Sequence, residues 1–432
     1  MPDLEQKLKK KTAIIGIVGL GYVGLPLALA FSEAGFKVLG FDVQRKRVEL
    51  VNKGQAYIAD VDSKILSAAV DNKLLQATSD QNRLREVDTV CICVPTPLTR
   101  TKEPDLSYVI HESEELSKYL QSGQLIVLES TTYPGTTREV ILPILERSGL
   151  KGGRDFYLAY SPERVDPGNR KYNIRNTPKV VGGIDSLSAS LVRLLYQQVA
   201  DVVVSVSCPE VAEMTKVFEN VFRSVNIALV NELAQLCQKM GISVWEVIEA
   251  ASSKPFGYMP FYPGPGIGGH CIPFDPYYLA SKAREYDFHT RFIELAAEIN
   301  EQMPYYVVSR IMEALNTRGK NLNNASVLVL GAAYKRDVDD VRESPSLKLI
   351  QLLGEKGASV SYNDSYISNV KISENILSSV ELTEELLSSV DCVVIATDHS
   401  YYDYQQIADK ASLVFDTRGI TKKLNKPNII RL

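Results

Sequence analysis

Short apolar runs alternate with stretches of helical spacing along the first 160 residues of the chain. The apolar runs lie at 13–18, 37–41, 89–94, 125–129 and 157–160. This alternation predicts a parallel, doubly wound sheet with helices on its faces, so the expected fold class is α/β. In such a sheet, functional residues gather at the carboxyl ends of the strands.

The same pattern returns near the carboxyl end, where apolar runs begin at Ser326, Ser359, Cys392 and Leu413. These runs predict a second Rossmann-like sheet. Its first strand leads into the charged segment 335–345 instead of a full glycine triplet. Basic residues at that point suit the diphosphate of a nucleotide-linked substrate, and they also fit a plain connection between domains.

A long helix is predicted between the two sheets. Ser207 and Glu210 form a capping-box pattern, the helical spacing continues, and Gly241 supplies the stop. About 33 residues at roughly 1.5 Å each make a helix about 50 Å long. A helix of this length commonly links two domains and packs against a second copy, so we expect a homodimer or a higher homo-oligomer.

Two polar residues of this helix, Lys216 and Asn220, are four positions apart and therefore share a face. They fit a functional site, and they also fit a solvated stripe. The apolar residues between them are expected to face the core: Met214, Val217, Phe218, Val221, Val225, Ala228 and Leu229.

The first apolar run leads into a glycine turn and then a helix. The turn consists of Gly19, Leu20, Gly21, Tyr22, Val23 and Gly24. Its first two glycines permit a tight turn and close approach of a pyrophosphate, and the third lets the helix pack on the strand. Asp42 ends the next strand, where a carboxylate binds ribose hydroxyls and repels a 2′-phosphate. The expected cofactor is NAD, although Arg47 nearby also suits a phosphate.

The segment from Pro263 to Pro276 is rich in glycine and proline and contains one cysteine, Cys271. Asp275 is expected to cap a helix that has Pro276 at its first position. A thiol just before a helix N-terminus favours the thiolate, so Cys271 is a candidate nucleophile. The alternative is a buried structural cysteine.

Composition narrows the possible functions. A chain of 432 residues with 45% hydrophobic content and a formal charge of −4 should form two or three globular domains and is a poor fit for nucleic acid. No run of about eighteen apolar residues suggests a membrane span, and the lysine-rich segment 7–11 is expected to be a solvated helix or tail. The six cysteines are dispersed, which indicates free thiols in a reducing cytoplasm and no metal site.

Three polar loops follow predicted strands: 95–97, 130–135 and 161–169. Each alone fits a polar turn, but all three belong at the carboxyl edge of the first sheet. Together with the glycine turn, the segment 213–220 and the segment 268–271, they stand in the order found in the UDP-sugar 6-dehydrogenase family. The chain resembles that family over essentially its whole length.

Within the family, the chain looks most similar to bacterial UDP-N-acetyl-D-glucosamine 6-dehydrogenases of surface-polysaccharide pathways. The amino-acid sequences of the segments 161–169 and 254–264 are the basis of this likeness. In addition, His270 stands where UDP-glucose dehydrogenases have a small residue. The resemblance implies two Rossmann-like domains joined by a long central helix. The implied domains are an NAD-binding domain, a central catalytic and dimerisation domain, and a UDP-sugar-binding domain, at 1–206, 207–315 and 316–432.

The resemblance further implies a four-electron oxidation of the sugar C6 hydroxymethyl group, through a thiohemiacetal and a thioester on the cysteine. The implied catalytic residues are Cys271 as nucleophile, Lys216 and Asn220 at the developing oxyanion, Asp275 and Thr131 at the water, and Glu163 as acid/base. The implied NAD-binding residues are Gly19, Leu20, Gly21, Tyr22, Val23, Gly24, Asp42, Arg47, Val94, Pro95, Thr96, Ser130, Thr131 and Arg342. The implied substrate-binding residues are Glu163, Arg164, Val165, Lys216, Asn220, Tyr262, Gly264, Gly266, Gly268, Lys335 and Arg418.

Two other classes of protein share parts of this pattern. A simpler NAD oxidoreductase that removes one hydride needs no cysteine in the ligand loop. A non-catalytic sensor of NAD or nucleotide sugars need not keep Cys271, Lys216, Asn220 and Asp275 together. Within the resemblance, UDP-glucose, UDP-N-acetylgalactosamine and UDP-N-acetylmannosamine are the alternative substrates.

Overall fold

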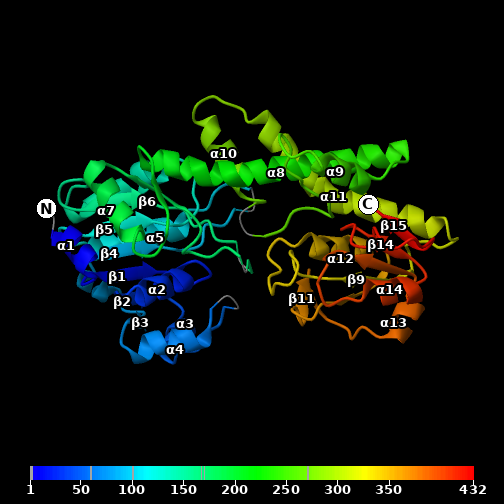
Figure 1. Cartoon of the computed structure of the whole chain (residues 1–432), viewed down its shortest axis with the longest axis horizontal. Helices are drawn as coiled ribbons and strands as arrows, with labels where there is room; N and C mark the ends of the chain where they lie inside the picture. Colours follow the sequence, from blue (N-terminus) through cyan, green and yellow to red (C-terminus); the bar gives the residue numbers. More distant parts are fainter. Residues whose placement is uncertain (1–2, 59–60, 100–101, 167, 170, 270–271) are drawn as a thin grey trace. The chain divides into compact units, whose positions relative to one another are not determined.

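The computed structural model describes residues 3–58, 61–99, 102–166, 168–169, 171–269 and 272–432. The chain forms two compact units (Figure 1): the first consists of residues up to 219 and of 277–288, and the second of 220–276 and 289–432. Each unit contains a largely parallel sheet covered by helices, which confirms the predicted α/β class. The three domain boundaries given above stay a prediction.

The sheet of the first unit has eight strands in the order β3-β2-β1-β4-β5-β6-β7-β8, whose first six follow the Rossmann order. The strands are β1 (Ile14–Val18), β2 (Lys37–Phe41), β3 (Leu75–Thr78), β4 (Thr89–Ile92), β5 (Leu125–Leu128), β6 (Tyr157–Tyr160), β7 (Lys179–Gly183) and β8 (Val203–Ser205). Within it, β7 is antiparallel to β6. The sequence patterns did not predict β3, β7 and β8, because β3 alternates buried and exposed residues, β7 ends in two glycines and β8 is short and largely exposed.

The helices of the first unit cover both faces of this sheet. They are α1 (Asp3–Lys10), α2 (Gly24–Glu33), α3 (Arg45–Asn52), α4 (Ser63–Asp71), α5 (Ser107–Tyr119), α6 (Leu142–Leu145) and α7 (Ser186–Tyr196), with short turns of helix at Gln81–Glu86, Thr136–Ile141 and Glu146–Ser148. The lysine-rich start forms a helix as expected, but it is not simply solvated. Leu4 and Leu8 of α1 are buried in the core, so α1 packs as an amphipathic helix.

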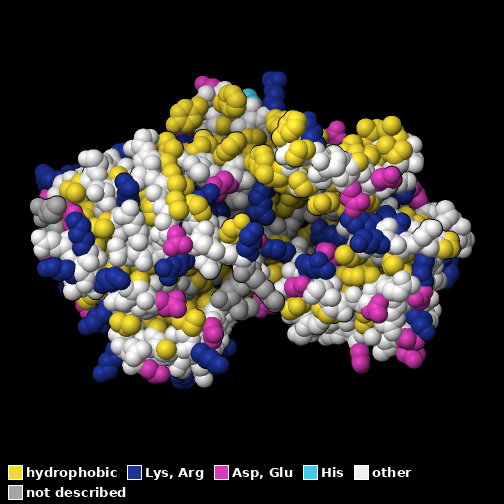
Figure 2. Space-filling view, viewed as in Figure 1, with side chains coloured by type: hydrophobic (Ala, Val, Ile, Leu, Met, Phe, Trp, Pro, Cys, Tyr) yellow, Lys and Arg dark blue, Asp and Glu magenta, His cyan; other side chains and the backbone are white. Residues whose placement is uncertain are grey.

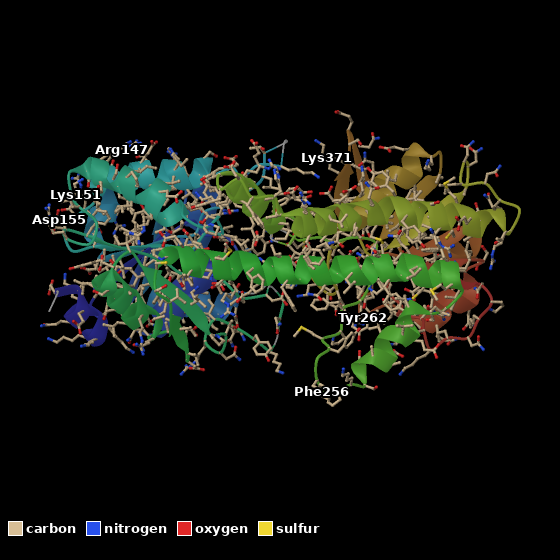
Figure 3. The ribbon with its side chains drawn as sticks, turned by 90° about the horizontal axis from the view of Figure 1, so that it is seen from above. Arg147, Lys151, Asp155, Phe256, Tyr262 and Lys371 are labelled. Carbon is tan, nitrogen blue, oxygen red and sulfur yellow. The ribbon has the colours of Figure 1, made fainter. Side chains whose placement is uncertain are left out.

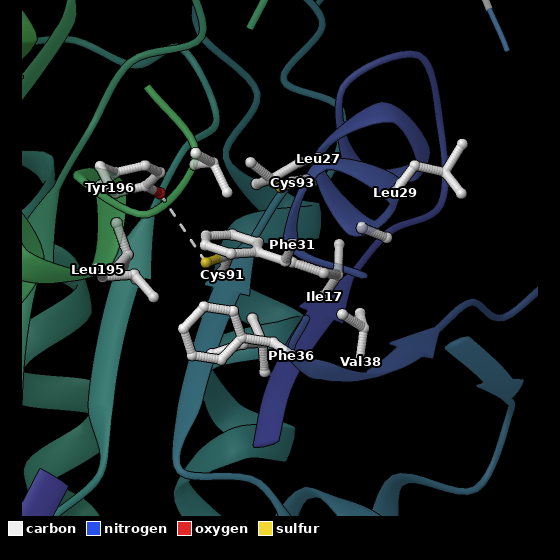
Figure 4. Close-up of a cluster of buried hydrophobic side chains, with 14 of the residues drawn as sticks. Ile17, Leu27, Leu29, Phe31, Phe36, Val38, Cys91, Cys93, Leu195 and Tyr196 are labelled. Carbon is white, nitrogen blue, oxygen red and sulfur yellow. Dashed lines mark hydrogen bonds between the residues drawn. The ribbon is translucent and has the colours of Figure 1, made fainter. Parts of the chain in front are cut away.

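An apolar core fills one face of this sheet (Figure 4). Phe31 and Phe36 meet edge to face with ring centroids 6.0 Å apart, and Tyr196 joins them. Cys91 and Cys93 are buried in this core, and burial raises the pKa of both thiols. These two cysteines are therefore inert packing residues at neutral pH.

The sheet of the second unit has five parallel strands in the order β10-β9-β13-β14-β15. They are β9 (Ser326–Leu330), β10 (Ser359–Asn363), β13 (Cys392–Ile395), β14 (Val414–Asp416) and β15 (Ile429–Arg431), and a separate hairpin pairs β11 (Asn369–Ile372) with β12 (Asn375–Ser378). The helices are α9 (Val244–Ser252), α11 (Arg291–Asn316), α12 (Pro345–Glu355), α13 (Glu384–Ser389) and α14 (Tyr404–Lys410). Two apolar clusters pack on the two faces of this sheet.

The predicted long helix is α8 (Pro209–Met240), which leads from the first unit into the second. It begins at Pro209 rather than directly after Ser207, because proline suits the first turn, where its missing N–H is not needed. Gly241 ends the helix with φ of +71°, as predicted. No helix of the described residues is long and apolar enough to cross a membrane.

Part of the apolar surface of α8 was expected to face the core and does not. Phe218 is 63% exposed, Leu229 is 64% exposed and Met214 is 42% exposed. Figure 2 shows apolar side chains gathered over α8 and α9, where Leu236 and Met240 are also exposed. The spacing identified the apolar positions correctly, but these positions span a wider arc of α8 than the rest of the chain covers in the described structure.

Candidate functional site

The glycine turn of the first unit forms a tight cradle after β1. A Cβ on Gly24 would lie 1.8 Å from the carbonyl oxygen of Gly19, and a Cβ on Gly19 would lie 2.8 Å from that of Cys93. Gly21 has no atom within 4 Å of its Cβ position, so the backbone there is open to a ligand. The N-terminus of α2 follows directly. This geometry fits the pyrophosphate of NAD, which a helix N-terminus and bare backbone bind.

Asp42 lies where the sequence places it, buried at the end of β2. Its carboxylate accepts hydrogen bonds from the N–H groups of Leu20 (3.0 Å) and Gln44 (2.8 Å). Arg47 pairs with the same carboxylate at 3.3 Å and lies over the ring of Tyr57. Arg47 is thus already partnered, so accommodating a 2′-phosphate would require it to leave Asp42.

The two loops predicted to contact the cofactor are tied to each other. Ser130 Oγ donates to the carbonyl of Val94 at 2.7 Å, and Thr96 Oγ1 donates to the carbonyl of Thr131 at 2.7 Å. Tyr278, from the part of α10 (Asp275–Arg284) that belongs to this unit, donates to the carbonyl of Thr96 at 2.6 Å. Tyr278 was not among the predicted site residues, because nothing in the helical pattern around it marks this contact. Pro95 between these residues is exposed.

Glu163, a predicted catalytic residue, is held at both oxygens of its carboxylate. Its Oε1 accepts the N–H groups of Arg164 and Val165, each at 2.6 Å, and its Oε2 lies 3.3 Å from Lys179 Nζ. Burial acts to raise the pKa of Glu163, but Lys179, the two N–H groups and Lys216 outweigh it and lower the pKa. Glu163 is therefore ionised at neutral pH and suited to accept a proton.

Arg164, a predicted substrate contact, is engaged within the protein. Its guanidinium pairs with Glu219 at 2.6 Å and donates to the carbonyl of Pro178 at 2.5 Å. Lys216 lies three residues before Glu219 on α8 and is half-buried. Glu163, Arg164 and Lys216 are thus brought together at the carboxyl end of β6.

Glu213, a residue given no role from the sequence, anchors this stretch of α8. Its carboxylate accepts hydrogen bonds from the N–H groups of Gly135 (2.6 Å) and Thr137 (2.8 Å) and from the Thr137 hydroxyl (2.7 Å). Burial raises the pKa of Glu213 to about 7 against the effect of these donors. The contact fixes α8, three residues before Lys216, against the turn that follows Thr131. The sequence did contain a sign of this contact, because Glu213 stands among the apolar positions of the helix. A glutamate that is buried at such a position requires hydrogen-bonding partners.

In the second unit, Asn220 and Asp275 are brought together. Asn220 Nδ2 donates to Asp275 Oδ2 at 2.5 Å, and both residues are buried. The helix α10 starts at Asp275 itself, so Asp275 is its first residue rather than the residue before it. Its Oδ2 accepts the hydrogen bond from Asn220, and its negative charge still favours the positive end of the helix dipole.

The loop 262–269 packs against the ends of β9, β13 and β14 in the second unit. Gly264 N donates to Asn231 Oδ1 at 3.0 Å, and a Cβ on Gly264 would lie 2.9 Å from the Arg418 guanidinium. Arg418 in turn donates through Nε to the carbonyl of Ala396 at 2.7 Å. Side chains are excluded at Gly264, which brings the backbone close to Arg418.

The same loop also lies on the charged segment after β9. A Cβ on Gly268 would lie 2.6 Å from Tyr334, the residue before Lys335, and Gly266 adopts φ of +134° beside Pro345. Gly269 N donates to the carbonyl of Arg342 at 2.9 Å. The predicted substrate residues Gly264, Gly266, Gly268, Lys335 and Arg418 are thus neighbours around one loop.

Two further predicted residues occupy the margins of this group. Tyr262 stacks on Trp245 with ring centroids 6.4 Å apart, and Figure 3 shows Phe256, six residues earlier in the chain, pointing outward. Arg342 pairs with Asp340, its NH2 group 2.6 Å from Oδ2. Arg342 was expected beside the nicotinamide; it belongs to the second unit, whereas the glycine turn belongs to the first.

The predicted catalytic residues divide between the two units: Thr131, Glu163 and Lys216 belong to the first, and Asn220 and Asp275 to the second. Cys271, the predicted nucleophile, and His270 lie outside the described residues. Among the residues that the structure describes, no group of three or more His, Cys, Asp or Glu side chains is arranged to hold a metal ion.

Comparison with known proteins gives matches along most of the chain. Three family models match: the UDP-glucose/GDP-mannose dehydrogenase family NAD binding domain at 13–200, its central domain at 210–302 and its UDP binding domain at 328–423. A UDP-N-acetyl-D-glucosamine 6-dehydrogenase of Salmonella typhi is 37% identical over 356 residues, covering 82% of each chain. Protein CapL of Staphylococcus aureus is 36% identical over 414 residues, covering 94% of this chain and 96% of its own.

A solved structure of a UDP-D-ManNAc dehydrogenase from Pyrococcus horikoshii superposes with a TM-score of 0.89 at 34% identity, covering 97% of this chain and 98% of the other. The solved structure therefore matches this chain in fold over residues of both units.

Proposed function

The chain belongs to the UDP-glucose/GDP-mannose dehydrogenase family and is an NAD-dependent UDP-sugar dehydrogenase, and on that premise we propose that it oxidises C6 of UDP-N-acetyl-D-glucosamine to the uronic acid. The observation that supports this reaction is that Glu163, which is ionised, lies near Lys216 in the unit that contains the glycine turn for NAD. The likeness to CapL and to the glucosamine enzyme supports a place in surface-polysaccharide synthesis.

Oxidation of a primary alcohol to a carboxylate removes four electrons, so two hydrides leave C6 and an aldehyde must be held between them. NAD would supply the hydride acceptor in both steps, and the residues that would hold it are the glycine turn, Asp42 and the loops at Thr96 and Ser130. The ammonium of Lys216 faces the oxygen that becomes negative, and Asn220 donates a second hydrogen bond to it. Glu163, already ionised, accepts a proton.

Cys271 would hold the aldehyde. Its thiolate forms a C–S bond to C6 while the carbonyl electron pair moves to oxygen, which gives a thiohemiacetal. Loss of the second hydride gives a thioester. Water ordered by Asp275 and Thr131 then forms a C–O bond, the C–S bond breaks and the thiolate leaves. Glu163, which has by then released its first proton to solvent, accepts the proton of this water.

The proposed identity of the sugar rests mainly on the resemblance at 161–169 and 254–264 to UDP-N-acetyl-D-glucosamine 6-dehydrogenases. The aromatic residues of the loop 254–264 also suit an acetamido group. The amide partners of such a pocket would be unpaired opposite a bare 2-hydroxyl, at about 1–3 kcal/mol each. UDP-N-acetyl-D-mannosamine is the second candidate, because the Pyrococcus structure is named for that sugar and matches 97% of this chain, against 82% for the Salmonella glucosamine enzyme.

The exposed apolar positions of α8 support a homodimer, and a cytoplasmic location stays a prediction.

The test is the catalytic efficiency of the purified chain on UDP-N-acetylglucosamine, UDP-N-acetylmannosamine, UDP-N-acetylgalactosamine and UDP-glucose. We expect two NADH per sugar and the highest efficiency on UDP-N-acetylglucosamine. One NADH per sugar would contradict the covalent route. Higher efficiency on UDP-glucose or on UDP-N-acetylmannosamine would make that sugar the assigned substrate and would leave the proposed type of reaction unchanged.

A further inference from the structure

A buried lysine lies behind the carboxylate of Glu163. Lys179 begins β7, its side chain is 5% exposed, and its Nζ lies 2.7 Å from Glu129 Oε2 and 3.3 Å from Glu163 Oε2. Glu129 directly follows β5 and is fully buried. One ammonium thus bridges two carboxylates at the carboxyl edge of the first sheet.

The bridge is itself held in place from the core side. The hydroxyl of Tyr196 donates to the second oxygen of Glu129, and the Tyr196 ring lies 5.0 Å from Lys179 Nζ. Tyr196 is fixed by the packed apolar cluster of Figure 4, where its hydroxyl also lies 3.9 Å from Cys91 Sγ. A buried ammonium without its carboxylates would be strongly unfavourable, so Lys179 has little freedom to move.

We propose that Lys179, held by Glu129 and Tyr196, is a positioning residue that fixes the carboxylate of Glu163 for its proton transfer. The inference rests on the proposed function. The N–H groups of Arg164 and Val165 hold Oε1, so Lys179 orients the remaining oxygen, Oε2.

The charged and titratable groups around Glu163 agree with this assignment. Lys179 faces it from β7, Lys216 from α8, Glu129 from the end of β5 and Cys93 from the segment after β4. Burial acts to raise the pKa of Glu163, and Lys179 is the largest of the influences that lower it. Loss of Lys179 should therefore both release Oε2 and raise the pKa of Glu163.

The test removes the ammonium of Lys179 together with its fully buried partner, Glu129. In a Lys179→Met, Glu129→Gln double variant, Glu163 keeps the N–H groups of Arg164 and Val165 and the charge of Lys216, so the variant is expected to fold with a melting temperature within a few degrees of the wild type. With UDP-N-acetylglucosamine as substrate, kcat should fall roughly ten- to hundredfold while both KM values change little. The acidic limb of the kcat–pH profile should move to higher pH, because Lys179 is the largest of the influences that lower the pKa of Glu163.

A matched control loses a different shielded lysine of the same unit. Lys282 is 6% exposed and pairs with Glu139 and Glu285, each at 2.6 Å, and no contact joins it to Glu163 within the described residues. Lys282→Met should leave kcat and the acidic limb unchanged. Lys179→Arg keeps the positive charge, so the acidic limb of its kcat–pH profile should lie nearer to that of the wild type than to that of the double variant. If the double variant does not fold, Lys179→Arg is compared with the wild type instead.

The inference is overturned by wild-type kcat and pH profile in the folded double variant, by a lower kcat with an unmoved acidic limb, or by a Lys179→Arg profile shifted as far as that of the double variant. A wild-type chain that oxidises none of the UDP-sugars contradicts the proposed function alone. In that case the crystal structure of the double variant decides: displacement of Glu163 Oε2 supports the positioning role, and an unchanged carboxylate overturns it.

Discussion

The two Rossmann-like units begin alike. The glycine at the end of the first strand donates its N–H to the end of the second strand, Gly19 to Phe41 at 2.8 Å and Gly331 to Asn363 at 2.9 Å. Both glycines have positive φ, +90° and +86°. In both units the acidic residue that ends the second strand then accepts backbone N–H groups of the turn.

The units differ in what else that carboxylate binds. Asp364 accepts N–H groups from Ala332 and Ala333 through one oxygen, which also meets buried His399 at 3.0 Å, and its other oxygen accepts the N–H of Tyr366. In the first unit, the hydrogen bonds of the corresponding carboxylate within the described residues come from two N–H groups and the half-buried Arg47. The two carboxylates therefore differ in their side-chain partner, which is a buried histidine in the second unit and a half-buried arginine in the first.

The helices that follow differ as well. In the first unit α2 begins at Gly24, so its N-terminus lies at the turn, whereas in the second α12 begins only at Pro345, after the charged segment. We expect the first unit to bind its nucleotide through turn and helix, and the second through the segment 334–345 with the loop 262–269. The comparison teaches that a shared turn does not imply a shared mode of nucleotide binding.

The largest expected effect tests the separation of nucleophile and cofactor. Cys271→Ala should reduce carboxylate formation to background while NAD affinity stays within about twofold, because the cradle belongs to the other unit. Carboxylate formation is measured as NADH and uronic acid produced, and cofactor affinity is measured by a fluorescence titration with NADH. Wild-type uronic acid yield would contradict the covalent mechanism.

Lys216→Ala should lower kcat on the order of a hundredfold with little change in KM, because an ammonium aimed at a developing oxyanion acts mainly in the transition state. Lys239→Ala near the exposed end of α8 is a control expected to change neither constant. Steady-state kinetics decides; near-normal turnover in Lys216→Ala would mean that Lys216 belongs to a solvated stripe.

A smaller effect sharpens the difference between the two carboxylates. Asp42→Asn should weaken NAD and shift the NADP-to-NAD efficiency ratio about tenfold toward NADP, since it frees Arg47 for a phosphate. Asp364→Asn should leave that ratio unchanged, because its carboxylate serves the fold of the second unit. An unaltered ratio in Asp42→Asn would show that Asp42 does not read the ribose.

The smallest effects are opposite pH dependences of stability. Burial raises the pKa of Glu213 to about 7 from 4.5, so its contribution to the free energy of unfolding falls as pH rises through that range. Burial acts to raise the pKa of Asp364, but His399 and the backbone N–H groups outweigh it and lower the pKa. Its contribution is therefore present above the unfolded pKa and lost as pH falls through the folded one.

Urea unfolding across pH 3–8 of Glu213→Gln and Asp364→Asn, each against the wild type, measures these two contributions. The difference from wild type should change in opposite directions with pH for the two variants. Parallel curves would contradict both assignments.

The local patterns of the sequence were sufficient for much of the fold and for the cofactor. Strands of buried apolar residues, such as β1 and β5, were predicted from their runs, and the turn from Gly19 to Gly24 was identified from its glycines, of which Gly19 and Gly24 leave no room for a Cβ. The end of α8 at Gly241 was predicted because glycine readily adopts the positive φ found there. These features depend on neighbours in the chain, which a sequence displays directly.

What only the tertiary structure decided depends on residues far apart in the chain. Glu129 and Lys179 each looked ordinary alone, and only the sheet order places them against Glu163. The core-facing assignment of Phe218 and Leu229 was wrong, because helical spacing identifies an apolar face but not what covers it. Burial and pairing are properties of the assembled sheet, and a charge acquires its partner and its pKa only when the chain has folded.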